Sequence, residues 1–441
     1  MRICLLTGGY PYRRDALGGW CRTLVAGLTG HTFHLIALTD RAAPAVPAYR
    51  LPGNVASARA VASAGAVRRR DADPDDAAAA AVLLCRGLLD DGDRAVDTFS
   101  HGLRRLSALA GSGDAPITGV PLTDALLDAW QAGRAAPAVD RMPLPRLCVR
   151  DARTAATLLR HVIRALAVRA PDTDLLHCVG GTTPLVAALA VRWRTGTPLL
   201  LTETRAPVAR HRPADDRLSP VIRTILRRFR RAVTRTGYAE AGLIAPLSAY
   251  HHRWSLRHGA PPARLVTVPV GVDPHDHPAA GQVAVYRAGP GDPPYPLIEA
   301  MMSGKAVVAA DVGPVAETLG DAGVLVPADD PAALAAARAA LLRDPTRRRD
   351  LGDAARRRAL RHFTADRVLR AYDALYTDLA GPPPSPVFEL TLAVPAPRAT
   401  RPGSQAPSPS VPSRPGPHGP ATVPDPGHPW SGRRRLTQEE R

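Results

Sequence analysis

Lysine and aromatic residues are scarce in this chain of 441 residues. Lys305 is the only lysine, so the formal net charge of +17 comes from arginine, and aromatic residues make up 4% of the chain. Proteins that bind nucleic acid by base stacking present aromatic side chains for it. The arginine content accompanies a general excess of alanine, proline and glycine, so the charge alone does not indicate a nucleic-acid partner.

Cysteine is also rare, and its spacing has no metal or disulfide signature. The five cysteines are scattered, and none belongs to a CxxC pair. A disulfide framework and a zinc site are therefore not expected. We expect reduced core cysteines in a cytoplasmic protein. They are Cys4, Cys21, Cys85, Cys148 and Cys178.

Long apolar runs are missing as well. The N-terminal apolar run has only about five residues, short of the roughly 7 to 15 of a signal peptide. No stretch approaches the roughly 18 apolar residues that a membrane-spanning helix needs. We therefore expect a cytoplasmic chain whose membrane contact, where it occurs, is peripheral and at the inner face of the membrane.

The first forty residues alternate in the manner of a doubly wound sheet. The strand RICLL leads through a glycine-bearing loop into the helix WCRTLVAGL and then into the strand TFHLIALT. The same rhythm resumes near residue 150 and continues to Asp273. The sequence predicts a Rossmann-like domain over residues 1–273, interrupted at about 43–150 by a helical insertion with the mobile connector NVASARAVASAGAVRRRDAD.

A second α/β unit follows over residues 274–380 and is short. It offers about three strands, where a complete doubly wound domain has about six. We therefore expect an incomplete Rossmann-like domain with exposed apolar edges. Residues 381–441 contain 16 of the 46 prolines and no sustained hydrophobic period, which predicts a disordered tail.

The glycine loop after the first strand is a candidate binding site. Gly8, Gly9, Gly18 and Gly19 allow a ligand to approach the backbone, and free N–H groups at the start of the next helix can hold a phosphate or a sugar. The spacing is not GxGxxG, so NAD binding is not indicated. The alternative is a glycine turn without a ligand.

Two polar residues lie at strand ends, where doubly wound sheets bind their ligands. His177, in DLLHCVGG, either orients a sugar hydroxyl and transfers a proton or is a structural residue with satisfied nitrogens. Glu203, at the end of PLLLTE, either meets a substrate or caps a surface loop. The sequence leaves both pairs of alternatives open.

The stretch GDPPYPLIEAMMSGK, residues 291–305, predicts a helix that starts near Tyr295 and stops at a glycine. Glu299 lies one turn into this helix, where its carboxylate can accept hydrogen bonds from two ribose hydroxyls. The N–H groups of the first turn can face a diphosphate. Pro293, Pro294 and Pro296 remove three of those donors.

A long basic helix is expected at about residues 218–236. Its apolar residues share one face, and its arginines occupy the others. Either the apolar stripe packs on the sheet and the arginines are solvated, or the helix rests on anionic lipid.

These segments resemble family 4 of the retaining glycosyltransferases, which have the GT-B architecture, and most closely the branch linked to Pel-type exopolysaccharide synthesis. The matching pieces include LTGGYPYRRDALGGW, LLHCVGGTTPLVAALAVRWRTGTPLLLTE, VPVGVD, PYPLIEAMMSGKAVVAADVG and AETLGDAGVLVPADDPAALA, and they cover most of residues 1–40 and 150–380. The resemblance implies two facing Rossmann-like domains and a nucleoside-diphosphate sugar held mainly by the second. This sugar nucleotide would be a substrate, and neither a bound cofactor nor a metal is expected.

The resemblance also implies roles for individual residues. Gly18 and Gly19 would lie near the donor phosphates, and Tyr295 and Glu299 would belong to the donor site, with Glu299 on the ribose. The acceptor side would be lined by His177 and Glu203.

The chain departs from the family pattern at several positions, two of which bear directly on catalysis. The family pairs its ribose glutamate with a carboxylate eight positions earlier, which faces the transferred sugar, and this position is Gly291. Between GVDPHDHPAA and GQVAVYR, the family carries the first half of its second domain, including an Arg and Lys pair that neutralises the leaving diphosphate. We therefore assign no catalytic residue.

Two functions follow from the resemblance. The chain is either a glycosyltransferase that moves a hexose from a nucleotide sugar to a glycan or lipid-linked acceptor with retention, or a non-catalytic relative that serves as a binding or assembly module in polysaccharide synthesis. A basic surface protein attached to lipid or nucleic acid is a third, weaker alternative. The expected partners are the sugar donor, the acceptor and a polysaccharide-synthesis complex, without nucleic acid.

Overall fold

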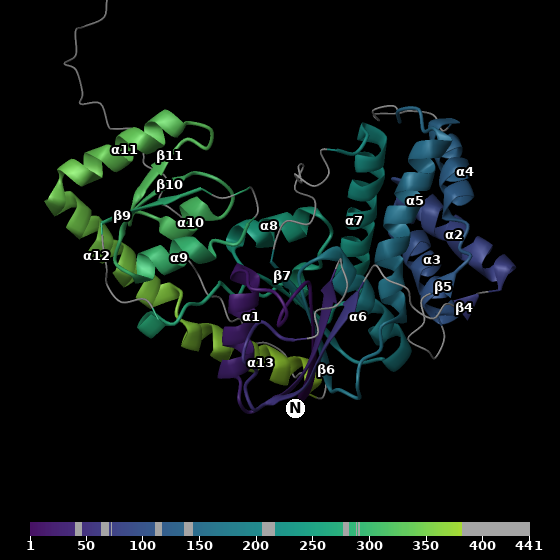
Figure 1. Ribbon diagram of the computed structural model, residues 1–441, viewed down its shortest axis with the longest axis horizontal. Helices are drawn as coiled ribbons and strands as arrows, with labels where there is room; N and C mark the ends of the chain where they lie inside the picture. Colours follow the sequence, from purple (N-terminus) through teal and green to yellow (C-terminus); the bar gives the residue numbers. More distant parts are fainter. Residues whose placement is uncertain are drawn as a thin grey trace, which may run out of the picture. The chain divides into compact units, whose positions relative to one another are not determined.

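The computed structural model of the chain describes residues 1–39, 46–62, 70–71, 73–110, 117–135, 144–204, 217–276, 282–287, 289 and 292–381. Gly291 and the tail from residue 382 onward, for which the sequence predicts disorder, lie outside the described residues. The described strands form two larger parallel sheets and one two-stranded sheet (Figure 1).

Six parallel strands form the first sheet, in the order β3-β2-β1-β6-β7-β8. This is the strand order of a doubly wound nucleotide-binding fold, whose ligand crevice lies beside the first strand, at the carboxyl edge. In this sheet that place is between β1 and β6. The strands are β1 (Arg2–Thr7), β2 (Thr32–Thr39), β3 (Val55–Ala62), β6 (Leu175–Val179), β7 (Leu199–Glu203) and β8 (Leu243–Pro246).

Helices cover both faces of the first sheet, because side chains of alternate strand residues point to opposite faces and both faces are apolar. On one face lie α1 (Ala16–Gly27) and α13 (Ala365–Ala380). On the other lie α5 (Val149–Ile163), α6 (Thr182–Thr195) and α7 (Pro220–Glu240). Shorter helices are α8 (Ala249–Arg257) and the 3-10 turns η1 (Arg164–Ala167), η3 (Pro262–Arg264) and η4 (Pro274–Asp276).

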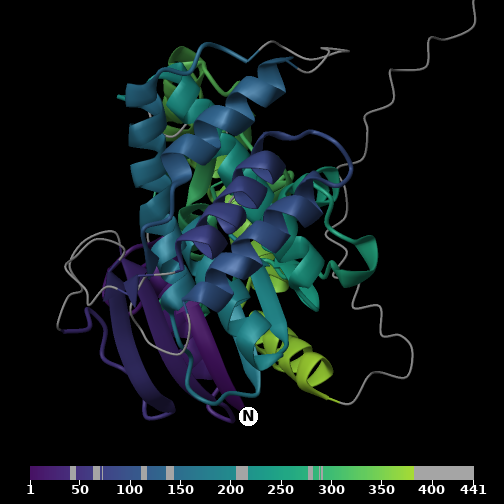
Figure 2. The same cartoon turned by 90° about the vertical axis from the view of Figure 1, so that its right-hand side faces the viewer.

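Residues 70–135 add a helical layer that packs on α5 and α7 (Figure 2). It contains α2 (Pro74–Leu89), α3 (Ala95–Leu109) and α4 (Leu122–Ala135), with the short parallel pair β4 (Arg70–Asp71) and β5 (Ile117–Thr118). α2 and α3 cross at two glycines. A Cβ at Gly87 would lie 2.7 Å from the Ala95 carbonyl oxygen, and one at Gly102 would lie 2.8 Å from the Leu84 Cα.

Two sequence predictions are wrong in this part of the chain. Val55–Ala62, predicted as part of a mobile connector, is the edge strand β3 and pairs with β2. Its residues are mostly small and none is fully buried, so the sequence shows no alternation of apolar and polar residues there. LVTVPV, where the α/β rhythm up to Asp273 predicts a further strand, is not a strand of the sheet: it makes an isolated parallel bridge between Leu265 and Ile244, and Val266 and Val268 donate to carbonyl oxygens of β8.

The second sheet has three parallel strands, in the order β11-β10-β9. The described residues thus form an α/β protein with parallel sheets, and this confirms the α/β fold class predicted from the sequence. Val285 on β9 is 43% exposed and Leu325 on β11 is 37% exposed, as expected for a short sheet. The elements are β9 (Val283–Tyr286), β10 (Ala306–Ala310), β11 (Val324–Val326), α9 (Tyr295–Met302), α10 (Val315–Leu319), α11 (Pro331–Arg343) and α12 (Pro345–His362).

The α2–α3 crossing gives a test of the fold. Gly102→Ala places a methyl group against the backbone of Leu84, and we expect it to lower the free energy of unfolding by about 1–3 kcal/mol, as overpacking does. Gly133→Ala on α4 is the matched control, since its Cβ meets only the flexible end of Leu144 at 3.3 Å. Urea denaturation followed by circular dichroism measures both. Equal stability of the two variants would contradict the close crossing.

Candidate functional site

The start of α1 forms one wall of the candidate donor site. Asp15 caps the helix: its Oδ1 accepts the Gly18 N–H at 2.7 Å, and its carbonyl oxygen accepts the Gly19 N–H at 2.9 Å. The two glycine N–H groups are therefore used inside the protein, contrary to the expectation of free donors at these positions. A Cβ at Gly18 would lie 2.8 Å from the Arg13 carbonyl oxygen, so the packing here requires glycine.

The helix α9 faces this wall. The Tyr295 hydroxyl lies 3.9 Å from the position that a Cβ on Gly19 would occupy. Glu299 follows Tyr295 by four residues and is half-buried, so both lie on the same side of α9. The structure therefore brings Gly18, Gly19, Tyr295 and Glu299 to one region. Their contact with a donor stays a prediction.

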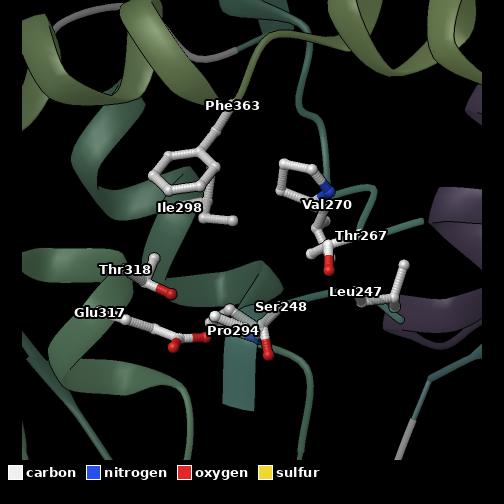
Figure 3. A pocket seen from close by; sticks show the side chains of 11 residues that line it. Leu247, Ser248, Thr267, Val270, Pro294, Ile298, Glu317, Thr318 and Phe363 are labelled. Carbon is white, nitrogen blue, oxygen red and sulfur yellow. The ribbon is translucent and has the colours of Figure 1, made fainter. Parts of the chain in front are cut away.

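A pocket of about 140 Å³ lies where the β8–α8 connection meets α9 and α10. Figure 3 shows Glu317 and Thr318 on one side of it, Thr267 and Val270 on the other, and Phe363 above. Pro294, the residue before α9, and Ile298 on α9 line the pocket. They directly precede Tyr295 and Glu299 in the sequence. It is lined by Leu247, Ser248, Ala249, Thr267, Pro269, Val270, Pro294, Ile298, Glu317, Thr318 and Phe363.

Glu317 ties the two walls of this pocket together. Its Oε1 accepts the backbone N–H of Tyr250 at 2.9 Å, in the first turn of α8, and its Oε2 lies 3.5 Å from the Arg253 guanidinium. A carboxylate at a helix N-terminus is stabilised by the helix dipole. Arg358 in turn donates to the carbonyl oxygens of Glu317 and Thr318, each at 2.8 Å. α10 is therefore held on both sides.

Sequence reasoning missed Glu317, Ser248 and Phe363. Glu317 lies in the family-like piece AETLGDAGVLVPADDPAALA, but more than sixty residues separate it from Ser248. The one local signal was Ser248, whose Oγ accepts the His251 N–H at 3.2 Å as a helix cap. Their meeting depends on long-range packing.

His177 is completely buried, and both ring nitrogens have partners in the protein. Nδ1 lies 2.8 Å from the Tyr376 hydroxyl and Nε2 lies 2.8 Å from Thr202 Oγ1, which also pairs with the Tyr372 hydroxyl at 2.9 Å. Burial lowers the pKa of His177 to about 3, so the ring is neutral. These contacts match the structural alternative, and the acceptor-side role stays an untested prediction.

Glu203 is only 6% exposed and lies away from His177. It hydrogen-bonds the Tyr238 hydroxyl of α7, which donates to Ser255 Oγ at 3.2 Å. His177 contacts α13 on the opposite face of the sheet, so the structure does not bring the two residues together. Burial raises the pKa of Glu203 to about 8, which keeps this carboxyl protonated at neutral pH.

The remaining expectations concern cysteine, metal and membrane. Cys148 is exposed and caps α5, contrary to the prediction of five core cysteines, whereas the other four are buried. In the described ranges, no three His, Cys, Asp or Glu side chains are grouped as metal ligands. The described helices also include none with the length and apolarity to cross a bilayer.

The buried tyrosine network predicts a stability effect. Tyr376→Phe leaves His177 Nδ1 without its partner, and we expect the free energy of unfolding to fall by about 1–3 kcal/mol. Tyr250→Phe is the control, since its hydroxyl is half-buried and makes no hydrogen bond within the described ranges. Urea denaturation measures both. A Tyr376→Phe protein as stable as the control would rule out the network as a source of stability.

Glu203 predicts a pH dependence of stability. The unfolded carboxyl loses its proton above pH 4.5, whereas the folded one keeps it up to about 8, so the folded state binds more protons in this window. Stability should therefore fall as pH rises through the window, by at most about 1.4 kcal/mol per unit. Glu203→Gln should remove this fall in denaturant titrations. An unchanged slope would show that Glu203 is not its source.

Comparison with known proteins gives two family matches. Residues 292–358, which include α9 and Glu299, match the model for glycosyl transferases group 1. Residues 1–115 and 142–263 match the model for a domain of unknown function, DUF3492. No curated protein matches the sequence.

Several solved structures resemble the chain at low identity. Sucrose-phosphate synthase from Thermosynechococcus elongatus is 15% identical, with a TM-score of 0.48 over 86% of this chain and 98% of that one. Anabaena HepE in complex with UDP and glucose is 11% identical, with a TM-score of 0.49 over 86% of this chain and 100% of that one. Because the DUF3492 model matches more than half of the sequence, the chain belongs to the DUF3492 family.

Proposed function

We propose that the chain is a glycosyltransferase-type protein that binds a nucleoside-diphosphate sugar between α1 and α9. The observation that carries the proposal is the position of α9. This helix starts the segment that matches glycosyl transferases group 1, and its Tyr295 hydroxyl reaches to Gly19 at the start of α1. Glu299 on the same side of α9 would accept two ribose hydroxyls.

The donor diphosphate would face the first turn of α9. Pro294 and Pro296 have no N–H to offer there, whereas Tyr295 and Leu297 do. The proposed site therefore has fewer anion-binding donors than an ordinary helix start. Gly19, where a Cβ would meet only the Tyr295 hydroxyl at 3.9 Å, contributes room for the donor to approach the backbone rather than a hydrogen bond.

The proposed reaction is that of a retaining, family 4-type hexosyltransferase without a metal. The bond between the sugar C1 and the diphosphate oxygen breaks, and the acceptor oxygen bonds to C1 on the same face. The acceptor's proton passes to the departing phosphate oxygen. The acceptor would be a glycan or a lipid-linked sugar of the kind used in Pel-type exopolysaccharide synthesis.

A second candidate is a non-catalytic sugar-nucleotide-binding module in polysaccharide assembly. Two observations favour it. Gly291 stands where the related enzymes carry the carboxylate that faces the transferred sugar. The second sheet has three strands, and the segment that would supply the Arg and Lys pair for the leaving diphosphate is missing. Loss of one such preorganised charge costs about 3–4 kcal/mol of transition-state stabilisation.

Calorimetry on the full chain tests donor binding. We expect UDP, GDP or their sugars to bind, and Glu299→Gln to weaken the binding by roughly ten- to a hundredfold, since a hydrogen bond to a charged group contributes about 1.5–3 kcal/mol. Asp353→Asn, an exposed carboxylate on α12, should leave it unchanged. No binding to wild-type protein, or an equal loss in both variants, would refute the donor site.

A transfer assay separates the two candidates. Donor binding with transfer of the sugar to an acceptor in the retained configuration would support the enzyme, and donor binding without transfer would support the binding module. Gly291→Glu restores the sugar-facing carboxylate of related enzymes. Increased transfer by this variant, at unchanged donor affinity, would assign the weak turnover to this position.

A further inference from the structure

Arginines form a row on the outer side of α7. Arg223, Arg227 and Arg231 are exposed and stand four residues apart, so they lie on one side of the helix along about 12 Å. The opposite side is core, where Ile225 and Val233 are completely buried. This confirms the alternative that the apolar stripe of α7 packs in the protein. The arginines are left for another partner.

The row continues onto α8, which follows β8. Burial, together with the charges of Arg231, Arg257 and Arg235, lowers the pKa of His258. α7 and α8 are adjacent here: Arg235 Nε lies 3.6 Å from the position that a Cβ on Gly259 would occupy, and the Tyr238 hydroxyl donates to Ser255 Oγ at 3.2 Å. We name the group the arginine surface; it consists of Arg223, Arg227, Arg231, Arg235 and Arg257.

The arginine surface lacks counter-charges in the part of the chain that the structure describes. No described carboxylate forms an ion pair with Arg223, Arg227, Arg231 or Arg257. By contrast, Arg228 on another side of α7 has a bidentate pair with Asp91 at 3.0 Å. Exposed like charges this close repel one another, and an external polyanion would relieve that repulsion.

We propose that the arginine surface docks the chain on a bilayer that contains anionic lipid. The row is extended and exposed, which suits a charged plane better than a small anion in a cavity. Leu256, 38% exposed, lies beside Arg257 and offers an apolar side chain to the bilayer interface. The rings of Trp254 and His258 stack with their centroids 3.6 Å apart. One face of Trp254 is therefore covered, which leaves less of this ring for stacking on a nucleic-acid base.

Vesicle co-sedimentation of the full chain tests the proposal. The probes are vesicles of phosphatidylcholine alone and of phosphatidylcholine mixed with phosphatidylglycerol, at low and high salt. We expect binding to the anionic vesicles only, weakened by salt. A triple variant, Arg223→Gln with Arg227→Gln and Arg231→Gln, should bind about a hundredfold more weakly, at about fivefold per arginine.

A matched control removes three exposed arginines elsewhere, Arg347→Gln with Arg349→Gln and Arg357→Gln on α12, and should keep the binding to within a few fold. Restoring the charge with lysine at the three α7 positions should restore binding, which excludes a folding defect. Equal losses in both triple variants, or no binding at low salt, would overturn the proposal. So would a loss of RNA binding in the α7 variant with vesicle binding unchanged.

Discussion

The return of α13 to the first sheet is the contact on which the rest of the structure depends. His177, Thr202, Tyr372 and Tyr376 form one buried chain of hydrogen bonds between two strands and this helix. A buried polar network is stable only when its members are satisfied, so it permits one arrangement of the helix on the sheet. The network fixes the helix that follows the segment from β9 to α12. The bond from the Val272 N–H to the Phe363 carbonyl oxygen joins the beginning of this segment to its end.

This anchoring explains how a sheet of three strands is accommodated. On its outer side the second sheet has a small buried cluster of Ala306, Val308, Val326 and Leu341. On the other side, residues of β10, α9 and α12 share one apolar cluster with α1, α13 and the first sheet. The second unit thus draws on the larger core, and its few strands do not need to supply a complete core of their own.

The sequence predicted elements where the pattern is local and missed contacts that are not. Buried strands such as β10 are continuous apolar runs, which the sequence pattern identifies. The partner of His177 lies 199 residues away, and no local pattern links a strand histidine to a tyrosine on the last described helix. Glu317 was missed for the same reason, since the N–H that its carboxylate accepts belongs to Tyr250, 67 residues earlier in the sequence. The glycines were found, but their N–H groups were already taken by Asp15.

Two kinds of contact matter in the proposed site: those that bind the donor in its ground state, and those that stabilise the transition state of sugar transfer. In this proposed site, Glu299 and the open backbone at Gly19 would contact the bound donor, and these contacts would lose little when the reacting end is altered. A carboxylate facing the sugar and a charge pair on the diphosphate would act where charge develops, and only such contacts accelerate the chemical step. By the resemblance to family 4 glycosyltransferases, this chain would lack the second kind, since Gly291 replaces the carboxylate and the segment with the charge pair is absent from the sequence. Donor affinity and turnover should therefore separate in this chain, with affinity the better preserved of the two.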